Sequence, residues 1–443
     1  MTTAQPDQPD FARRIARFAA EIAEHPDGLP DLVADMCRDM MLNAAAAALA
    51  GAAHPDGIAL ARGLRAMGGN GRSTIIGMGQ RTSPVHAALV NGTLIRLLDF
   101  DDNLVESGGT GAPQVHPTAA VFPAVMALGE MNGYAGNSVL AAFAVGCEIT
   151  ARMSQAPQIG RACGSIGAAT ASAMLFAPEE STIANAVGMA ATSANTGIGY
   201  QSAGAASIPE GHSAMHGVLA AITAAEGMQA APAHDVVADE ALDGLGRDWR
   251  LLDPGVTIRL YPCHSAGHSV IDAILGLLQL HRFGSNDIVS AHVGVTAETM
   301  RDLSQVLPSD GWQARASIGF IAAATLCHGQ PLINFFSDPA VQDEGVRAVM
   351  GRISVEATLT ASPLAPHPAE VAVSLSDGRT LRHRVDHPRG TPAMPLDAEE
   401  LEAKFLYCTR YILPADHIDE AIASFRGIAE IENVTGMASV LGG

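Results

Sequence analysis

Lysine is almost absent from this chain of 443 residues, and basic residues of any kind are scarce. Lys404 is the single lysine, so 25 of the 26 basic residues are arginines. Lysine is the residue most easily tuned into a base or a Schiff-base nucleophile, and only one position offers it. The 46 acidic residues give a formal net charge of −20. Because nucleic-acid binding requires clustered cations, this balance excludes nucleic acid as an expected partner.

Closely spaced cysteines and long apolar runs are also missing. The six cysteines are scattered without a Cys-x-x-Cys pair, whereas iron–sulfur clusters usually require tight thiolate spacing. No apolar run reaches the unbroken length of about 18 to 20 residues that spans a bilayer, and the start "MTTAQPDQPDFARR" is polar. We therefore expect no membrane partner and a reducing, cytoplasmic location.

Aromatic residues make up only 4% of the chain, although 48% of it is hydrophobic. Alanine supplies much of the hydrophobic fraction, and glycine is frequent as well. Such small side chains let helices approach closely. The chain is too long for one compact core, so two domains are expected. We predict a mainly α fold, with a large all-helical domain and a smaller inserted α+β lid domain.

The apolar pattern places the boundaries of these domains. Helical spacing, interrupted by short Gly/Pro turns, predicts the first part of a helical domain over residues 1–256. Alternating β-branched segments and the hairpin "EVAVSLSDGRTLRHRVD" predict the α+β lid over residues 257–388. Residues 389–443 are again helical and are expected to return to the first domain. Such an insertion leaves a cleft between domains, a common place for a small-molecule site.

The stretch "LLDFDDNLVESGGTGAPQVHPTAAVFPAVMALGE" places aspartates, a glycine-rich loop and a helix start side by side. Pro117 suits the first helical position, where its missing N–H costs nothing. His116 would then lie at the positive end of the helix dipole, which favours a neutral ring able to take a proton or polarise a carbonyl. Asp99 would orient that ring or pair with a substrate group. The alternative is that both residues merely cap their elements.

Two other interpretations of this stretch are weaker. Asp101 and Asp102 suit a solvated or capping loop end, and "DFDD" lacks the glycine and carboxylate rhythm of a calcium loop, so we predict no metal site. The loop "ESGGTGAPQV" has no P-loop lysine, which argues against phosphate binding. It is either a mobile loop that shapes the pocket mouth or a featureless surface loop.

Five segments in order resemble one known family. "NGTLIRLLDFDD…HPTAAVFPAVMALGE", "AVGCEITARM", "GSIGAATASAM", "GHSAMHGVLAA" and "YPCHSAGHSVIDA" are similar to the MmgE/PrpD family, from about Leu29 to Arg426. Its members include 2-methylcitrate dehydratase, cis-aconitate decarboxylase and iminodisuccinate epimerase. The resemblance implies a homodimer with a site between the domains and no metal or organic cofactor. It also implies proton transfer next to a carboxylate of a small polycarboxylate.

The resemblance places Asp99 and His116 on the family's active-site aspartate and histidine. Elsewhere this chain departs from the family, whose lysine near Ala206 has no counterpart here. Five further family residues are replaced, by Arg259 (lysine), Phe320 (tyrosine), Gln158 (histidine), Asn103 (threonine) and Arg96 (histidine). These changes remove anion-binding and proton-donating groups. Holding a tricarboxylate out of water takes several cations, so we expect a substrate other than cis-aconitate or 2-methylcitrate.

Arginines and histidines remain to bind and convert a less charged acid. Arg259 is the expected carboxylate anchor, with Arg96, Arg152 and Arg161 as further cations. His264 and His268, four residues apart, suit substrate contact or gating, or plain capping and packing, while a third zinc ligand is not evident.

The helix after the missing lysine carries His212 and His216, and either is a candidate to replace that lysine. Glu210 beside them is a further possible base.

The sequence thus predicts a cofactor-independent lyase, of dehydratase or decarboxylase type, acting on a small carboxylic acid. An isomerase or epimerase with two bases on opposite sides of one carbon is the first alternative. A non-catalytic small-acid binding protein on the same scaffold is the second.

Overall fold

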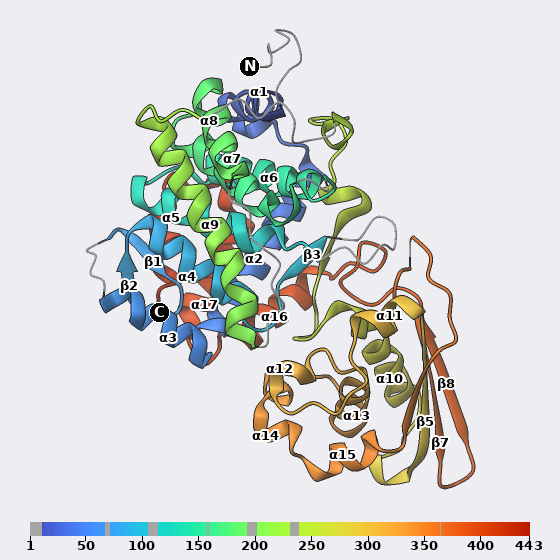
Figure 1. The fold of residues 1–443 in the computed structure, drawn as a ribbon. Helices are drawn as coiled ribbons and strands as arrows, with labels where there is room; N and C mark the ends of the chain where they lie inside the picture. The colour runs from blue at the N-terminus through green and yellow to red at the C-terminus, as the bar shows by residue number, and fades with distance from the viewer. Residues whose placement is uncertain are drawn as a thin grey trace.

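The computed structural model describes residues 11–66, 71–104, 114–156, 159–192, 202–230, 239–363 and 365–443. Its buried apolar side chains form two clusters. Residues 11–258 and 401–441 supply the first cluster, and we call this part the large lobe. Residues 261–381 supply the second, the small lobe. The two lobes lie one above the other in Figure 1.

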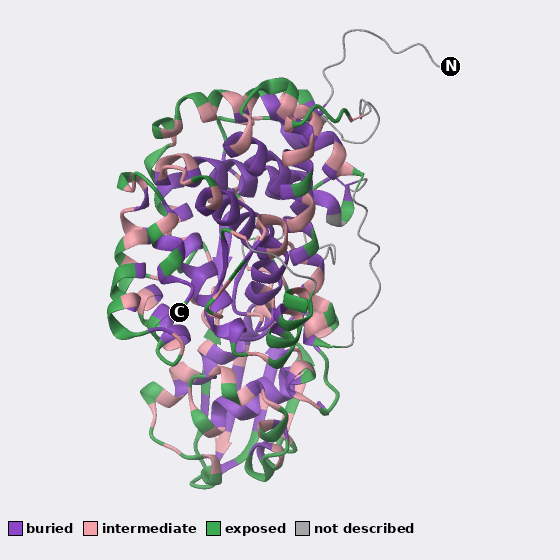
Figure 2. Ribbon diagram, turned by 90° about the vertical axis from the view of Figure 1, so that its left-hand side faces the viewer, coloured by how far each residue is buried: buried purple, intermediate pink, exposed green. Residues whose placement is uncertain are grey.

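Helices build the large lobe, as the apolar spacing predicts. In chain order they are α1 (Phe11–Glu24), α2 (Asp31–Ala52), α3 (Pro55–Ala66), α4 (Pro84–Arg96), α5 (Pro117–Asn132), α6 (Gly136–Met153), α7 (Cys163–Phe176), α8 (Glu180–Ala191), α9 (Ala203–Ala225), α16 (Ala398–Thr409), α17 (Ala415–Arg426) and α18 (Thr435–Val440). Buried residues run through the middle of this lobe (Figure 2). No helix of the described residues is both long and apolar enough to cross a membrane.

Glycines let the large-lobe helices pack closely. A Cβ atom on Gly211 of α9 would lie 2.3 Å from the backbone oxygen of Leu89 in α4. A Cβ atom on Gly167 of α7 would lie 2.0 Å from Oγ1 of Thr150 in α6. Both distances are impossible for a larger residue, so the small-residue composition allows these helix pairs to form.

The small lobe is a four-stranded sheet with helices on one face (Figure 1). Its strands are β5 (Ile288–Val295), β6 (Ile353–Ala357), β7 (Ala369–Leu375) and β8 (Thr380–Val385), in the order β6-β5-β7-β8. The helices are α10 (His268–Leu280), α11 (Ala297–Asp302), α12 (Gly311–Ala314), α13 (Ile318–His328), α14 (Asp338–Val341) and α15 (Glu344–Met350). Only β5 and β6 are parallel, and Gly378, with φ of 89°, forms the predicted β7–β8 turn. A mainly α fold with a smaller α+β part is confirmed.

Two short ribbons accompany the helices of the large lobe, where the sequence predicts helices up to residue 256 and a β-branched strand segment from there on. β1 (Ser73–Ile75) pairs with β2 (Gln80–Thr82), and β3 (Asp102–Leu104) pairs antiparallel with β4 (Val256–Ile258). Strands of three residues are too short to show an alternating pattern. The β3–β4 ribbon lies where the chain leaves the large lobe for the small one, and it carries the acidic run of the sequence.

Candidate active site

The acidic run lies between the end of α4 and strand β3. Asp99 has a φ of 50°, the one positive value outside glycine in the described residues. This left-handed residue turns the chain sharply between the two elements. The side chains of Asp101 and Asp102 are fully buried, whereas that of Asp99 is 23% exposed. Asp99 is therefore the carboxylate of the run that a ligand can reach.

Two arginines hold the carboxylates of Asp99 and Asp101. Nη1 of Arg96, at the end of α4, is 3.1 Å from Oδ1 of Asp99 and 2.7 Å from Oδ1 of Asp101. Nη1 of Arg259, which follows β4, is 2.9 Å and 3.3 Å from the same two oxygens. Burial alone would raise the pKa of each carboxyl, but the guanidinium charges outweigh it and hold both pKa values well below the usual range. Both aspartates are ionised at neutral pH.

His116 stands directly before α5, and Pro117 opens the helix as the sequence predicts. Nδ1 of His116 lies 2.7 Å from the backbone oxygen of Asp102 and 3.0 Å from Oδ2 of Asp101. Both neighbours are acceptors, so Nδ1 carries the proton. In a neutral ring Nε2 then keeps its lone pair, and no described residue forms a hydrogen bond with it. The arrangement suits a general base.

The aspartate that contacts His116 in the structure is not the one that the sequence suggests. His116 is partnered by Asp101 rather than Asp99, whose carboxylate meets Arg96 and Arg259 instead. The prediction of Asp101 and Asp102 as a solvated loop end is wrong. Both side chains are buried because the chain enters the β3–β4 ribbon at this point, beneath α5.

Asp102 is a buried carboxyl without a cationic partner. Its Oδ2 accepts a hydrogen bond from Oγ1 of Thr118, in the first turn of α5. Its Oδ1 has no partner among the described residues. Burial, and then the nearby charge of Asp101, raise the pKa of Asp102 to about 7. The side chain is therefore partly protonated at neutral pH, while its backbone oxygen holds His116.

Arg259, the predicted carboxylate anchor, is fully engaged by protein groups. Its side chain is completely buried, and its Nε donates to Oδ1 of Asn103 at 3.3 Å. Its Nη2 donates to Oε1 of Gln114 at 2.6 Å, and its Nη1 meets the two ionised aspartates. Gln114 in turn donates to Oγ of Ser265, 2.6 Å away in the small lobe. Arg259 thus links the β3–β4 ribbon, through Gln114, to the small lobe. The side-chain oxygen of Asn103 is already used in its hydrogen bond with Arg259.

His264 and His268 take different places. Nδ1 of His264 accepts a hydrogen bond from the backbone N–H of Ala266 at 3.3 Å, so Nε2 carries the proton. Burial, and then the charge of Arg259, lower the pKa of His264 to about 3, which keeps this donor ring neutral. His268 is 1% exposed and packs edge-on against Tyr261, with ring centroids 5.1 Å apart. Of the two predicted roles, capping describes His264 and packing describes His268.

Arg315, which the sequence does not single out, comes from the small lobe between α12 and α13. It is 5% exposed, and its Nη1 donates to the backbone oxygen of Leu97 in the large lobe. Neither Nε nor Nη2 has a partner in the described part of the chain. Its charge also acts on Asp99. Arg315 is therefore a cation with donors to spare beside the exposed carboxylate.

The contacts of the described residues do not bring His212 and His216 to this cluster. Both lie on α9, where their rings stack 6.2 Å apart and His212 is exposed. The charge of Glu210, on the same helix, acts on Arg96 of the cluster. Burial lowers the pKa of Arg96, but the carboxylates of the acidic run and of Glu210 outweigh this and raise it above its usual value.

Two other predicted contacts are structural. Phe320 is 1% exposed in the core of the small lobe and packs on Phe336, so it lines no site. Arg152 is fully buried, pairs with Glu148 at 2.6 Å and donates to backbone oxygens of residues 241–248. Gln158, the side chain of Arg161 and the glycine-rich loop from residue 105 to residue 113 lie outside the described residues.

The sequence also leaves Lys404 without a site role, although its being the only lysine singles it out. The side chain is 4% exposed on α16, directly behind the β3–β4 ribbon. Burial lowers its pKa to about 8.

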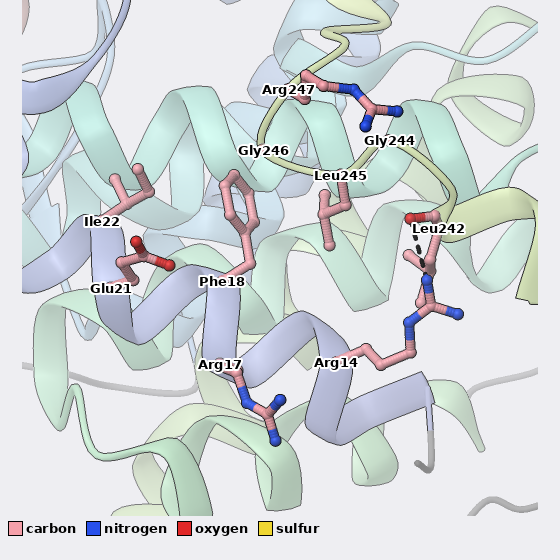
Figure 3. Close-up of a pocket in the computed structure, with 10 residues that line it drawn as sticks. All are labelled: Arg14, Arg17, Phe18, Glu21, Ile22, Leu242, Gly244, Leu245, Gly246 and Arg247. Atoms are coloured by element: carbon pink, nitrogen blue, oxygen red, sulfur yellow. Dashed lines mark hydrogen bonds between the residues drawn. The ribbon is translucent and has the colours of Figure 1, made fainter. Parts of the chain in front are cut away.

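A groove of about 590 Å³ lies elsewhere, between α1 and the turn Leu242–Arg247 (Figure 3). Two of its arginines are engaged locally: Arg14 donates to the backbone oxygen of Leu242, and Arg247 pairs with Asp248. No histidine is among the described residues that line this groove. The acidic run with His116 is therefore the better candidate site.

Comparison with known proteins agrees with the two-part chain. The MmgE/PrpD N-terminal domain matches residues 13–245 and the MmgE/PrpD C-terminal domain matches residues 261–426. Human cis-aconitate decarboxylase is 24% identical over 394 residues, which cover 82% of this chain and 80% of that protein. The mouse protein of the same name is 25% identical over 394 residues, covering 82% and 79%. A cis-aconitate decarboxylase-like protein of Aspergillus oryzae is 22% identical over 471 residues, covering 94% of each chain.

Proposed function

This chain belongs to the MmgE/PrpD family, and we propose that it is a cofactor-independent lyase that dehydrates or decarboxylates a small carboxylic acid. The names of its relatives support a lyase-type function. The observation that carries the proposal is the His116 ring, whose Nδ1 faces two acceptors while its Nε2 has no partner among the described residues.

His116 is the group that moves the proton. Asp101 and the backbone oxygen of Asp102 hold the proton on Nδ1, so Nε2 is free to accept one from the carbon next to the substrate carboxylate. In a dehydration the protonated ring returns this proton to the departing hydroxyl, which leaves as water. In a decarboxylation the ring first takes a proton from water at Nε2, the C–C bond then breaks with release of CO₂, and Nε2 delivers this proton to the resulting carbanion. Asp101 stabilises the charged ring in both cases.

The substrate carboxylate is held from the small lobe. Arg315 has unpartnered donors, and His264 offers a neutral Nε2–H that no described residue occupies. Asp99 and Asp101 already neutralise the charges of Arg96 and Arg259. One guanidinium therefore remains for the ligand, which favours an acid with fewer carboxylates than cis-aconitate.

Protonation of the histidines favours a lyase over the alternative epimerase. An epimerase needs a second base facing the opposite side of the same carbon. His264 is the first candidate for this second base. Its Nδ1 accepts a hydrogen bond from the backbone N–H of Ala266, so its Nε2 carries the proton and is a donor rather than a base. His268 is buried in packing contacts, and no contact of the described residues brings His212 or His216 to the acidic run. Glu210, whose charge acts on Arg96, is the residue that an epimerase would use as its second base.

Turnover in deuterated water tests the proposal. A panel of small hydroxy and unsaturated monocarboxylic and dicarboxylic acids is incubated with the protein, and water loss or CO₂ release is followed by NMR. We expect product from at least one acid and a loss of about 1,000-fold or more in kcat for His116→Ala, with His212→Ala unchanged. Exchange of the carbon-bound proton without net product would support the epimerase. Binding that raises Tm without exchange or product would support the non-catalytic alternative.

A further inference from the structure

Lys404 is the only lysine of the chain, and its ammonium group is fully hydrogen-bonded inside the large lobe. Nζ donates to Oδ1 of Asn43 at 2.6 Å, to the backbone oxygen of Phe100 at 2.7 Å and to that of Arg259 at 2.5 Å. It also lies 3.9 Å from the centre of the Phe100 ring. An ammonium has three N–H donors, and each has one acceptor.

Two of these acceptors belong to the segments that build the candidate site. The Phe100 carbonyl is part of the peptide that leads into Asp101, and Arg259 follows strand β4. The backbone N–H of Arg259 donates to the backbone oxygen of Asp101 at 3.1 Å. Lys404 therefore holds the peptide before Asp101 directly, through the Phe100 oxygen, and the peptide after it indirectly, through Arg259. From there one contact reaches His116, through Oδ2 of Asp101.

We propose that Lys404 is a positioning residue, which holds the segments of Asp101 and Arg259 together so that His116 keeps its proton on Nδ1. The catalytic consequence of this role rests on the proposed function, whereas the effect of Lys404 on the protonation of the His116 ring does not. A role as nucleophile or base is excluded by the geometry, because all three protons are donated and the Phe100 ring covers the group.

The choice of lysine follows from shape and charge. Three acceptors around one nitrogen fit a tetrahedral ammonium and not a planar guanidinium. The ionised carboxylate of Asp101 and the ionised fraction of Asp102 both favour the charged form of Lys404. Without a cation here, three buried acceptors would lose their donor and the ribbon would relax.

Lys404→Met keeps the length of the side chain and removes the three donors. We expect kcat per folded molecule to fall about 100-fold with KM changed little, because misplacing a catalytic group by about 1 Å costs that much. Arg426→Met is the matched control. Arg426 pairs with Asp39 of α2 and Glu402 of α16, so its loss perturbs the same helices without touching the ribbon. Its kcat per folded molecule should be unchanged.

A second measurement does not depend on turnover. In protein labelled with ¹⁵N-histidine, the His116 signals are those missing from His116→Ala. We expect the wild type to show a protonated Nδ1 and an unprotonated Nε2, and Lys404→Met to show a mixture of tautomers. If Lys404→Met does not fold, the wild type is titrated from pH 7.5 to 9.5. Loss of one ammonium proton near pH 8 should then move the same signals; among the groups facing Lys404, Asp102 titrates lower and Cys408 higher, near pH 12.

The outcomes separate the two ideas. A folded Lys404→Met protein with unchanged His116 signals would overturn the positioning role, as would an equal loss of kcat in Arg426→Met. Unchanged signals in the wild-type titration would overturn it too. If the wild type converts no acid but Lys404→Met still shows the mixture of His116 tautomers, the lyase is rejected and the positioning role of Lys404 is kept.

Discussion

Replacing Asp102 by asparagine should make the protein more stable near neutral pH, and more so as the pH rises. The side chain is fully buried, its Oδ1 has no partner among the described residues, and the charge of Asp101 is nearby. These effects raise its pKa from 3.8 to about 7. The amide side chain of the Asp102→Asn variant would keep an oxygen for Thr118 and could not ionise.

The magnitude follows from proton linkage. Between about pH 4 and pH 7 the native state binds a proton at Asp102 that the unfolded state has released, so stability falls as the pH rises. Each pKa unit corresponds to about 1.4 kcal/mol. With values of 3.8 and about 7, this one group removes about 2 to 3 kcal/mol of stability between pH 5 and pH 8. The Asp102→Asn protein should not show that loss.

Urea unfolding at pH 5, 6, 7 and 8, followed by circular dichroism, measures the difference. The free energy of unfolding of the variant, relative to wild type, should increase by about 2 to 3 kcal/mol from pH 5 to pH 8. Asp419→Asn, which removes an exposed charge from α17, serves as the control and should give a flat difference. Parallel curves for wild type and Asp102→Asn would refute the reasoning, because Asp102 would then be ionised throughout.

Three further predictions concern the site and the core. Asp101→Asn presents an N–H to His116 and disfavours the Nδ1–H tautomer, so kcat should fall by about 100-fold or more. A loss under about fivefold would argue against a catalytic pair of His116 and Asp101. Phe320→Leu removes part of a core side chain, so Tm should fall, by an amount equivalent to about 1 kcal/mol, while KM stays the same; a raised KM would return Phe320 to the site. The kcat should decline above about pH 8 as Lys404 loses a donor, and a flat profile up to pH 10 would contradict this.

The fold was accessible from sequence wherever the signal was local and long. Helices α2, α5 and α6 show apolar spacing over 16 to 22 residues, and the Ser-Asp-Gly turn of the β7–β8 hairpin follows from turn chemistry alone. The pairing of the β3–β4 ribbon was not accessible, although "GVTIRLYP" indicates a strand at the position of β4. Each of its strands has three residues, and they pair across more than 150 positions of sequence.

Side-chain partners were harder to predict than which segments lie together. The sequence predicts that His116 lies beside the acidic run, as the contact of its Nδ1 with Asp101 shows, but it offers Asp99 as the partner of the ring or of a substrate group, whereas Asp101 lies beside the ring. The exchange with Asp101 depends on the left-handed backbone at Asp99, which no residue pattern in "DFDD" reveals. Arg259 looks free for a ligand in sequence, and only the fold brings Gln114 and Asn103 to it. Arg315 lies five residues before Phe320, the candidate that the sequence offers in this segment, and its contact with Leu97 depends on the fold.

The residues proposed to move the proton and those proposed to hold the substrate carboxylate lie on different lobes. His116 and Asp101 belong to the large lobe, while His264 and Arg315 belong to the small lobe, and the lobes are linked by the hydrogen bonds of Arg315 to Leu97 and of Gln114 to Ser265. If the lobes part to admit a ligand, these two hydrogen bonds break, so the proposed reaction centre would be complete only when the lobes are together. Turnover would then slow in viscous solvent wherever release of product governs the cycle.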